Sequence, residues 1–402
     1  MIYIFGVFAA IQIWFSFVSL KSGLAFYGFV QKELASTLSD LTCKVSLFIP
    51  CKGVDQGLRE NLQAIFDQQY ADYEIIFAVD DEADPAVAAI RSLIEQNATP
   101  AKLVIAEKAL ISGQKVENLR KAVLYADPLS KVFVFTDSDT RPEREWLARI
   151  VAPLEREGIG GASGYRWFIA PKPTFASELQ SVWNASIATT QGADPRKNFC
   201  WGGSMAVSRD TFERLAIRDK WQGTVSDDLV ITRSLLAEGL GIAFVPQALV
   251  VSFENRTLSE MLEFTTRQIK VTRAYTPHYW LISLLGSGLF LAVMAASIYW
   301  LFARSRTAAV AGAATLALVS ALSAAKSYIR LKAIRLALPE WDERLRRQIG
   351  THITLFLVTP LLFFYNGLAA LFSRRITWRG ITYVLKSPTE TVIIRPDVGD
   401  RT

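Results

Sequence analysis

The 402-residue chain is 51% hydrophobic with a positive mean hydropathy, which is high for a wholly soluble protein and predicts membrane segments beside one large soluble domain. Three cysteines without paired spacing and only two histidines argue against a disulfide framework and a zinc site. The net charge of +6 is mostly local, at 326–347 and 374–386, which indicates contact with lipid headgroups and argues against a nucleic-acid partner.

The first apolar segment, residues 2–20, carries no charge until Lys21 and is about long enough to cross a bilayer. No basic region precedes this segment and no small-residue cleavage site follows it. A retained transmembrane anchor over residues 1–21 is therefore expected, in preference to a cleaved signal peptide.

From Lys44 onward, strand-like and helix-like segments alternate. This alternation predicts right-handed βαβ units and an α/β fold with a mostly parallel sheet and helices on both faces. No G-x-G-x-x-G follows the first strand, so a dinucleotide-binding fingerprint is absent. The expected strands are 45–50, 73–79, 102–106 and 132–135, and the expected helices are 58–69, 86–96, 116–125 and 146–157.

After Gly158 the alternation loosens. Helices are expected at 174–190, 227–238 and 258–274, and strands at 160–168 and 243–246. Three more candidate spans follow at 280–302, 308–329 and 351–372; the Ala-rich middle one has a second interpretation as a buried helix. The expected domains are the anchor 1–21, a catalytic domain 44–255, an amphipathic interface helix 256–279, a membrane region with an interfacial tail 280–386, and a solvated tail 387–402.

Three acidic clusters lie in the soluble part, after strand-like runs or before a helix-like one. Carboxylates at the end of a buried parallel strand reach the sheet edge where open α/β sheets bind ligands. Several carboxylates gathered there would repel one another without a cation, which favours a divalent metal and a phosphate-bearing substrate. The clusters are Asp80-Asp81, Asp137 with Asp139, and Asp227-Asp228.

Each cluster has a simpler interpretation. Asp80-Asp81 could form an ordinary turn or accept hydrogen bonds from a nucleobase or ribose. Asp137 and Asp139 are two apart in an extended stretch, so both side chains point the same way and suit Mg²⁺ or Mn²⁺. The pair Asp227-Asp228 could cap a helix, or one carboxylate could remove a proton from an attacking hydroxyl.

The amphipathic stretch 258–275 carries three basic residues at helical spacing, Arg267, Lys270 and Arg273. Their charge suits a departing diphosphate. It equally suits lipid headgroups at the membrane surface, which is the favoured interpretation of the helix. Arg267 and Lys270 are the preferred diphosphate contacts of the three.

Taken together, these features resemble the membrane-bound family-2 and family-21 type glycosyltransferases with a GT-A fold. The likeness is greatest to ceramide glucosyltransferases and bacterial hopanoid or lipid glycosyltransferases, and it covers residues 45–385. In the opening segment VSLFIPCKGVD the first strand ends in Pro50 and K-G-V-D follows. SGQKVENL resembles the loop of that family that bears a lysine and an asparagine, and ITWRGITYVL resembles its W-R-G-x-x-Y motif.

The resemblance implies a role for each motif. Asp81, with Asp80 as the second choice, would contact the uridine. Asp228 would be the catalytic base with Asp227 beside it. Gly202 and Gly203 would let the backbone approach the sugar or the acceptor, although they are equally well explained as turn glycines. The remaining expected site residues are Pro50, Lys115 and Asn118 near the nucleotide, and Asp137 and Asp139 on the metal and the donor diphosphate.

Two departures from the family pattern matter. Where the family has Q/R-x-x-R-W, this chain reads Arg267-Gln-Ile-Lys270-Val271, which loses the bidentate guanidinium and the Trp. That loss argues against a polymer product. The second departure is topological: four full crossings from an outside N-terminus would place 374–386 outside, so one segment is expected to be re-entrant or interfacial.

The expected function is that of an integral membrane enzyme of the plasma or inner membrane with its catalytic domain on the cytoplasmic side. It would transfer a sugar from a UDP-sugar to a lipid acceptor with inversion, using Mg²⁺ or Mn²⁺. The acceptor stays open among ceramide-like lipids, hopanoids and other lipid hydroxyls. The alternatives are a processive polysaccharide synthase and a non-catalytic membrane subunit with the same fold.

Overall fold

The computed structural model describes residues 2–36 and 42–394, and the chain folds into two compact units. The sheet unit consists of residues 33–36, 42–171, 190–254 and 374–394. The helical unit consists of residues 2–32, 172–189 and 255–373. The expected catalytic domain 44–255 differs from this division, because residues 172–189 belong to the helical unit and residues 374–394 to the sheet unit.

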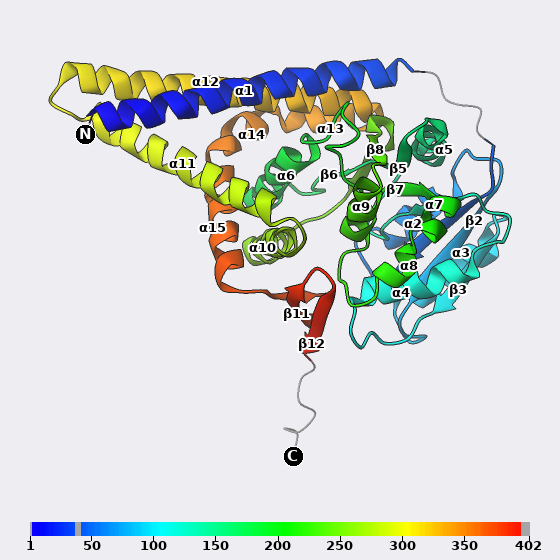
Figure 1. The fold of residues 1–402 in the computed structure, drawn as a ribbon. Coiled ribbons are helices and arrows are strands. Elements are labelled where there is room, and N and C mark those ends of the chain that lie inside the picture. Colours follow the sequence, from blue (N-terminus) through cyan, green and yellow to red (C-terminus); the bar gives the residue numbers. More distant parts are fainter. Residues whose placement is uncertain (1, 37–41, 395–402) are drawn as a thin grey trace. The chain divides into compact units, whose positions relative to one another are not determined.

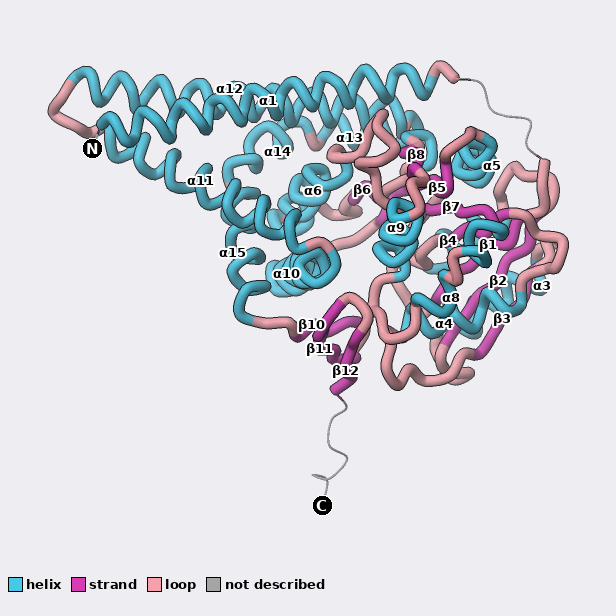
Figure 2. The backbone as a smooth tube through the Cα atoms, viewed as in Figure 1, coloured by secondary structure: helices cyan, strands magenta, loops and turns pink. Residues whose placement is uncertain are grey.

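The sheet unit is built on a seven-stranded sheet of order β3-β2-β1-β4-β7-β5-β8 (Figures 1 and 2). The first four strands in that order are parallel, β7 is antiparallel to both of its neighbours, and β5 and β8 are parallel. This confirms the expected α/β class with a mostly parallel sheet. The strands are β1 (Val45–Pro50), β2 (Tyr73–Val79), β3 (Ala101–Ile105), β4 (Val132–Phe135), β5 (Ile159–Ser163), β7 (Met205–Ser208) and β8 (Gly241–Phe244).

Helices cover both faces of this sheet. Alternate side chains of a strand point to opposite faces, so Leu47 and Ile49 of β1 enter the core beneath α2, α3 and α5. Phe48 points the other way and packs with Phe133 and Phe135 of β4, and those rings meet Phe212 of α7. The helices are α2 (Leu58–Phe66), α3 (Ala86–Gln96), α4 (Gln114–Ala122), α5 (Trp146–Val151), α7 (Arg209–Arg214), α8 (Ile217–Lys220) and α9 (Asp227–Ala237), with short 3₁₀ turns at 123–125, 152–155 and 246–248.

Two small sheets complete the sheet unit. Strands β6 (Arg166–Phe168) and β9 (Val250–Ser252) pair in parallel. Strands β10 (Arg375–Trp378), β11 (Ile381–Ser387) and β12 (Glu390–Ile394) form an antiparallel sheet that buries Ile376, Tyr383 and Leu385. The sequence analysis did not predict this sheet within the expected interfacial and solvated tail, where the β-branched and aromatic side chains of residues 375–394 alternate into packed strands. The interfacial location itself stays a prediction. Residues 395–402 of that expected tail lie outside the described residues.

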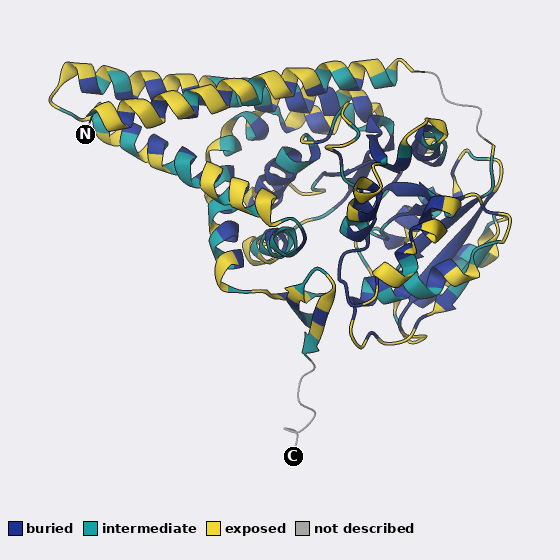
Figure 3. Cartoon of the chain, in the orientation of Figure 1, coloured by how far each residue is buried: buried dark blue, intermediate teal, exposed yellow. Residues whose placement is uncertain are grey.

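The helical unit contains the candidate membrane spans. Three helices, α1, α11 and α12, are long and apolar enough to cross a membrane, and a fourth candidate is a pair of helices bent by 53°. Their outer surfaces expose large apolar side chains such as Trp14, Phe17, Ile282 and Leu318, as a lipid-facing surface requires (Figure 3). The helices are α1 (Ile2–Leu34), α6 (Phe175–Ala188), α10 (Leu258–Tyr275), α11 (Pro277–Leu301), α12 (Arg306–Ala337), α13 (Asp342–Arg347), α14 (Ile349–Thr354) and α15 (Thr359–Phe372), with 3₁₀ turns at 339–341 and 355–357.

Candidate active site

The acidic residues expected in the site lie at the carboxyl edge of the parallel strands. Strand β4 ends at Phe135, and the chain then turns so that the Thr140 hydroxyl donates to the Asp137 carbonyl at 2.8 Å. The Thr136 hydroxyl donates to the Gly203 carbonyl at 2.9 Å, which joins this turn to the glycine loop. The expected grouping of strand ends at one edge therefore holds for Asp137 and the loop that bears Gly203.

Lys115 joins two of the three acidic clusters. Its ammonium nitrogen lies 2.8 Å from Asp137 Oδ1 and 3.2 Å from Asp227 Oδ1, so one cation of α4 bridges the turn after β4 and the start of α9. Burial alone would lower the pKa of Lys115, but Asp137 and Asp227 raise it above its ordinary value. Lys115 is therefore charged, and it holds the two carboxylates together.

A second cation, Arg166 of β6, lies between the two carboxylates of the D-x-D motif. Its guanidinium is 3.4 Å from Asp137 and 3.5 Å from Asp139, and it lies 4.7 Å from the centre of the Trp201 ring. Burial opposes ionisation of Asp137, but Lys115 and Arg166 hold the pKa of that carboxyl below its ordinary value. The sequence analysis did not identify Arg166, because no spacing relates β6 to the acidic motifs.

Asp228 and Asp227 open helix α9 and have different surroundings. Asp228 accepts hydrogen bonds from the Ser226 hydroxyl, from the Leu229 amide at 2.7 Å and from the Gly202 amide at 3.1 Å. Asp227 is 2% exposed, and its Oδ2 accepts no hydrogen bond within the described part of the chain. Burial raises the pKa of Asp227 to about 6, with Lys115 opposing the rise.

Gly202 is required at its position by this arrangement. A Cβ at residue 202 would lie 2.6 Å from Asp227 Oδ2 and 2.7 Å from Lys115 Nζ, so any side chain would displace the ion pair. Gly202 is thus required beside the ion pair, and an approach to the sugar or the acceptor stays a prediction. A Cβ at Gly203 would instead collide with the Trp201 ring at 2.1 Å, which is a packing requirement.

The D-x-D carboxylates fit a divalent cation. Asp139 Oδ1 is buried and accepts no hydrogen bond from any residue that the structure describes. Burial raises the pKa of Asp139 to about 6, Arg166 opposes the rise and Asp137 adds to it. Among residues 2–36 and 42–394 no three His, Cys, Asp or Glu side chains form a complete metal site. Magnesium commonly uses one or two carboxylates and takes its other ligands from substrate phosphates and water, so two carboxylates suffice.

The first acidic cluster is separate and has its own cations. Asp80, at the end of β2, is buried, and both of its oxygens lie 2.9 Å from Lys52 Nζ. Lys108 lies 3.2 Å from Asp80 and 2.9 Å from the more exposed Asp81. Lys108, above all, holds the pKa of Asp81 below its ordinary value. Burial raises the pKa of Asp80, but Lys52 and Lys108 outweigh it and hold that pKa low as well.

Two of the expected nucleotide residues occupy supporting positions. Pro50 is the last residue of β1 and is partly buried. Asn118 is 2% exposed; its side chain donates to the Ala78 carbonyl at 3.4 Å and accepts from Gln114 at 2.9 Å. Asn118 thus ties α4 to β2. Any contact of either residue with a nucleotide stays a prediction.

The hairpin β10–β11 adds residues that the sequence analysis did not assign. Arg379, in its two-residue turn, donates to both oxygens of Asp55 at 2.6 and 2.7 Å, and Asp55 accepts from the Ser138 hydroxyl at 3.3 Å. The Tyr383 hydroxyl accepts from the Gln114 amide at 3.2 Å. Both residues of the ion pair lie in motifs that the sequence analysis named: Asp55 in K-G-V-D and Arg379 in W-R-G-x-x-Y. Only the fold shows that the two motifs are in contact.

Arg267 and Lys270 lie on α10 of the helical unit. The Arg267 guanidinium lies 5.5 Å from the centre of the Phe264 ring on the same helix. Helix α10 confirms the amphipathic helix expected at 258–274, and Thr257 with Glu260 forms a capping box at its start. A diphosphate contact by either basic residue stays a prediction.

Comparisons with known proteins indicate the family to which the chain is similar. The model of glycosyl transferase family 21 matches residues 5–391. Ceramide glucosyltransferase 1 of Caenorhabditis elegans is 23% identical over 252 residues, which are 58% of this chain and 51% of that protein. Ceramide glucosyltransferase 3 of the same organism is 20% identical over 245 residues, 59% of this chain and 52% of that protein. The chain thus spans about half the length of these relatives.

The fold is similar to that of a solved glycosyltransferase structure. The mannosyltransferase PcManGT from Pyrobaculum calidifontis, solved in complex with GDP-Man and Mn²⁺, has a TM-score of 0.52 with this chain. The two are 19% identical, and the match covers 84% of this chain and 99% of the mannosyltransferase. At that identity the likeness supports the fold only.

Proposed function

Because the chain belongs to glycosyl transferase family 21, it is a glycosyltransferase, and we propose that it transfers a sugar from a UDP-sugar to a lipid hydroxyl with inversion. The observation that carries this proposal is the bridge from Asp137 through Lys115 to Asp227 at the carboxyl edge of the sheet. Such a group of carboxylates and cations suits a charged donor and proton removal from an acceptor. The similarity to ceramide glucosyltransferases supports a lipid as that acceptor.

The donor diphosphate is assigned to the D-x-D region. Asp137 and Asp139 would hold Mg²⁺ or Mn²⁺, whose chemistry is to neutralise the charge that develops on the departing diphosphate. Without the donor, Lys115 and Arg166 already compensate these carboxylates. The uridine is assigned to Asp80 and Asp81 at the end of strand β2, which β1 separates from β4 in the sheet.

Asp228 is the better candidate for the base than Asp227. Asp228 is partly exposed and is oriented by hydrogen bonds from Ser226 and Gly202. Asp227 is buried and paired with Lys115, so an acceptor hydroxyl cannot approach it as readily. In the step, the Asp228 carboxylate takes the hydroxyl proton, the oxygen bonds to the anomeric carbon, and the bond from that carbon to UDP breaks.

The helical unit supports an acceptor drawn from the membrane. Its three candidate spans accompany the sheet unit on one chain, so that the donor can come from water and the acceptor from the bilayer. The proposal places the sheet unit on the cytoplasmic side, where sugar nucleotides are made.

The test is lipid analysis of a host that lacks glycolipids. Expression of the intact chain should add a lipid that is heavier by one sugar, and Asp228→Asn should abolish it. UDP binding, measured by calorimetry, should change less than about threefold in that variant, because the base is not a nucleotide contact. Asp219→Asn, which alters an exposed carboxylate on α8, is the control.

Three results would contradict the proposal. A polymeric sugar product would identify a polysaccharide synthase. Transfer by Asp228→Asn at the wild-type rate would remove this residue as the base. Absence of any sugar-bearing product, with UDP binding intact, would favour a non-catalytic subunit.

A further inference from the structure

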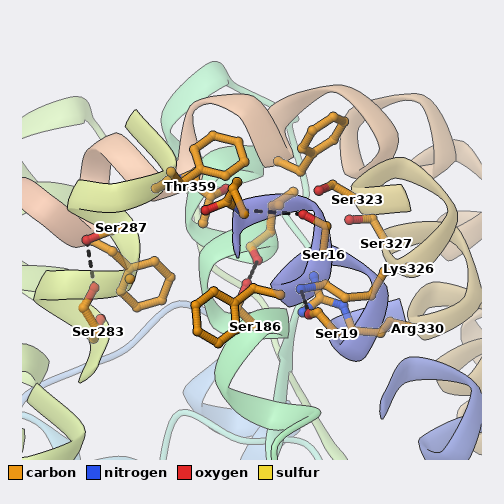
Figure 4. Close-up of a pocket in the computed structure, with 18 of the residues that line it drawn as sticks. Ser16, Ser19, Ser186, Ser283, Ser287, Ser323, Lys326, Ser327, Arg330 and Thr359 are labelled. Carbon is orange, nitrogen blue, oxygen red and sulfur yellow. Dashed lines mark hydrogen bonds between the residues drawn. The ribbon is translucent and has the colours of Figure 1, made fainter. Parts of the chain in front are cut away.

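The helical unit contains a cavity of about 340 Å³ that the proposed transfer reaction does not use (Figure 4). Helices α1, α6, α11 and α12 and residues 356–363 bound it. Its volume is within the range of small-ligand sites. One part of its wall is aromatic and aliphatic, and the other part consists of serine hydroxyls and two cationic side chains, Lys326 and Arg330.

The two cations lie one helical turn apart on α12 and have neutral partners. Lys326 Nζ donates to the Ser19 hydroxyl of α1 at 2.7 Å, and Arg330 donates to the Thr189 hydroxyl at 3.3 Å. In the part of the chain that the structure describes, neither cation lies within 4 Å of a carboxylate. Two positive charges thus line one cavity without a compensating negative charge.

The Arg330 side chain gives the strongest indication of a ligand in this cavity. It is 5% exposed, and its Nε has no hydrogen-bond partner among residues 2–36 and 42–394. Within the same residues the Ser327 hydroxyl, also on this wall and 1% exposed, has none either. A buried guanidinium without an anion costs several kcal/mol, and its planar fork matches the oxygens of a phosphate or carboxylate. The unpaired donor groups of Arg330 and Ser327 therefore indicate an oxyanion as the ligand.

Sequence position indicates the depth of this cavity in the bilayer. Lys326 lies twenty residues along α12 from Arg306, which is about 30 Å at the rise of an α-helix and equals the thickness of the hydrocarbon core. Ser19 lies just before Lys21, the first charge of α1. Both helices thus bring their polar residues to the cavity where the apolar stretch ends, which is the level of lipid headgroups.

We propose that this cavity binds the anionic headgroup of a membrane lipid, with its phosphate or carboxylate oxygens on Lys326 and Arg330. The aromatic wall, formed by Phe290, Phe356 and Phe363, would contact the first part of an acyl chain. This wall favours a lipid over a free anion of the same chemistry. The proposal does not depend on the transfer reaction.

The experiment is thermal unfolding of the purified full chain in neutral detergent. The probes are phosphatidylglycerol, diacylglycerol with the same acyl chains, and inorganic phosphate. Phosphatidylglycerol should raise the melting temperature, because a ligand that binds the native state stabilises it, whereas diacylglycerol should not. Inorganic phosphate should have a much smaller effect at equal concentration, since it lacks the contact with the aromatic wall.

In the double variant Lys326→Gln with Arg330→Gln, phosphatidylglycerol should no longer raise the melting temperature. This variant should bind the lipid at least about tenfold more weakly than wild type. Without lipid it should melt at or above the wild-type temperature, since it no longer buries uncompensated charge. That measurement also establishes that it folds. Lys332→Gln is the matched control, because it removes an exposed cation from the same helix.

Three outcomes would overturn the proposal. One is an equal response to phosphatidylglycerol and diacylglycerol. The second is a wild-type response in the double variant. The third is stabilisation by inorganic phosphate as strong as that by the lipid, which would make the site one for a free anion.

Discussion

At the scale of single residues, Lys115 is the link on which the acidic cluster depends. Its Nζ contacts Asp137 at 2.8 Å and Asp227 at 3.2 Å, so removal of this buried cation takes a compensating charge from both carboxylates. The two carboxylates respond differently, because Arg166 also contacts Asp137 whereas Asp227 has Lys115 as its single ion-pair partner among the described residues. Burial of the charged form therefore costs more folding free energy for Asp227 than for Asp137.

This difference predicts a pH-dependent stability. Burial raises the pKa of Asp227 to about 6, so its stabilising contribution is full below the ordinary pKa of Asp and is lost as pH rises through about 6. Asp227→Asn, without metal or donor, should therefore melt a few degrees above wild type at neutral pH. This difference should disappear at acidic pH, where the wild-type carboxyl is protonated.

Melting curves of both proteins between neutral and acidic pH provide the check. Asp219→Asn is the control, because it shows how much the loss of an exposed carboxylate alone changes the melting temperature. A lower melting temperature for Asp227→Asn across the whole range would mean that the ion pair with Lys115 outweighs the cost of burial.

At the scale of elements, the hairpin β10–β11 delivers an arginine to the D-x-D region. Arg379 and Gly380 have φ values of 50° and 77°, as a two-residue hairpin turn with both residues in the left-handed region requires. A non-glycine residue in that region is uncommon. The turn is paired to Asp55, which also accepts from Ser138 between the two D-x-D carboxylates.

This contact predicts energetic coupling between Arg379 and Asp55. Arg379→Ala and Asp55→Ala should each lower the transfer rate. The loss of activation free energy in the double variant should be smaller than the sum of the losses in the two single variants. A coupling of about 1 kcal/mol is expected, since the pair is partly exposed to solvent. Arg379→Lys should recover only part of the loss, because lysine keeps the charge and not the bidentate geometry.

The rates of the four proteins under subsaturating donor give this coupling. Arg374→Ala, in the same small sheet, should leave the rate within about twofold, because Arg374 donates to the Lys386 carbonyl. Strict additivity of the two single changes would show that the turn has no part in the site.

The sequence predicted some elements well and could not predict others. Strands β1, β2 and β4 are apolar runs buried on both faces, such as 73–79, and that pattern is visible without a structure. The strands 375–378 and 390–394 are short, carry charges and follow a candidate span, so their pairing depends on contacts that no periodicity reveals. For the same reason the acidic residues were identified, while Arg166, which pairs with Asp137 and Asp139, and Arg379, which pairs with Asp55, were not.

At the scale of the whole molecule, chain connectivity leads to a prediction about the number of crossings. Residues before α10 and after α15 belong to the same sheet unit, so we expect both ends of the stretch 255–373 to lie on one side of the membrane. If the candidate spans α11 and α12 both cross, the chain leaves that side and returns. We therefore predict that the bent pair, Ile349–Leu357 with Thr359–Phe372, enters and leaves on the same side, as a re-entrant segment.

This topology predicts which residues a membrane-impermeant maleimide reaches in intact cells. In a Cys43→Ser background, whose other two cysteines are buried, Arg304→Cys between α11 and α12 should be labelled from outside. Glu390→Cys on β12 should be labelled only after permeabilisation. Labelling of both from outside would mean that the bent pair crosses the membrane completely.

The sheet unit is assembled from separate stretches of chain, and its last strands follow the final helix of the membrane stretch. A fragment that ends at residue 254 therefore lacks the last strands of the sheet unit and is a poor choice for crystallisation. Such a product would lack Arg379 and leave Asp55 unmatched, and it would leave the Gln114 amide without the Tyr383 hydroxyl. A workable fragment needs residues 374–394 fused back through a short linker.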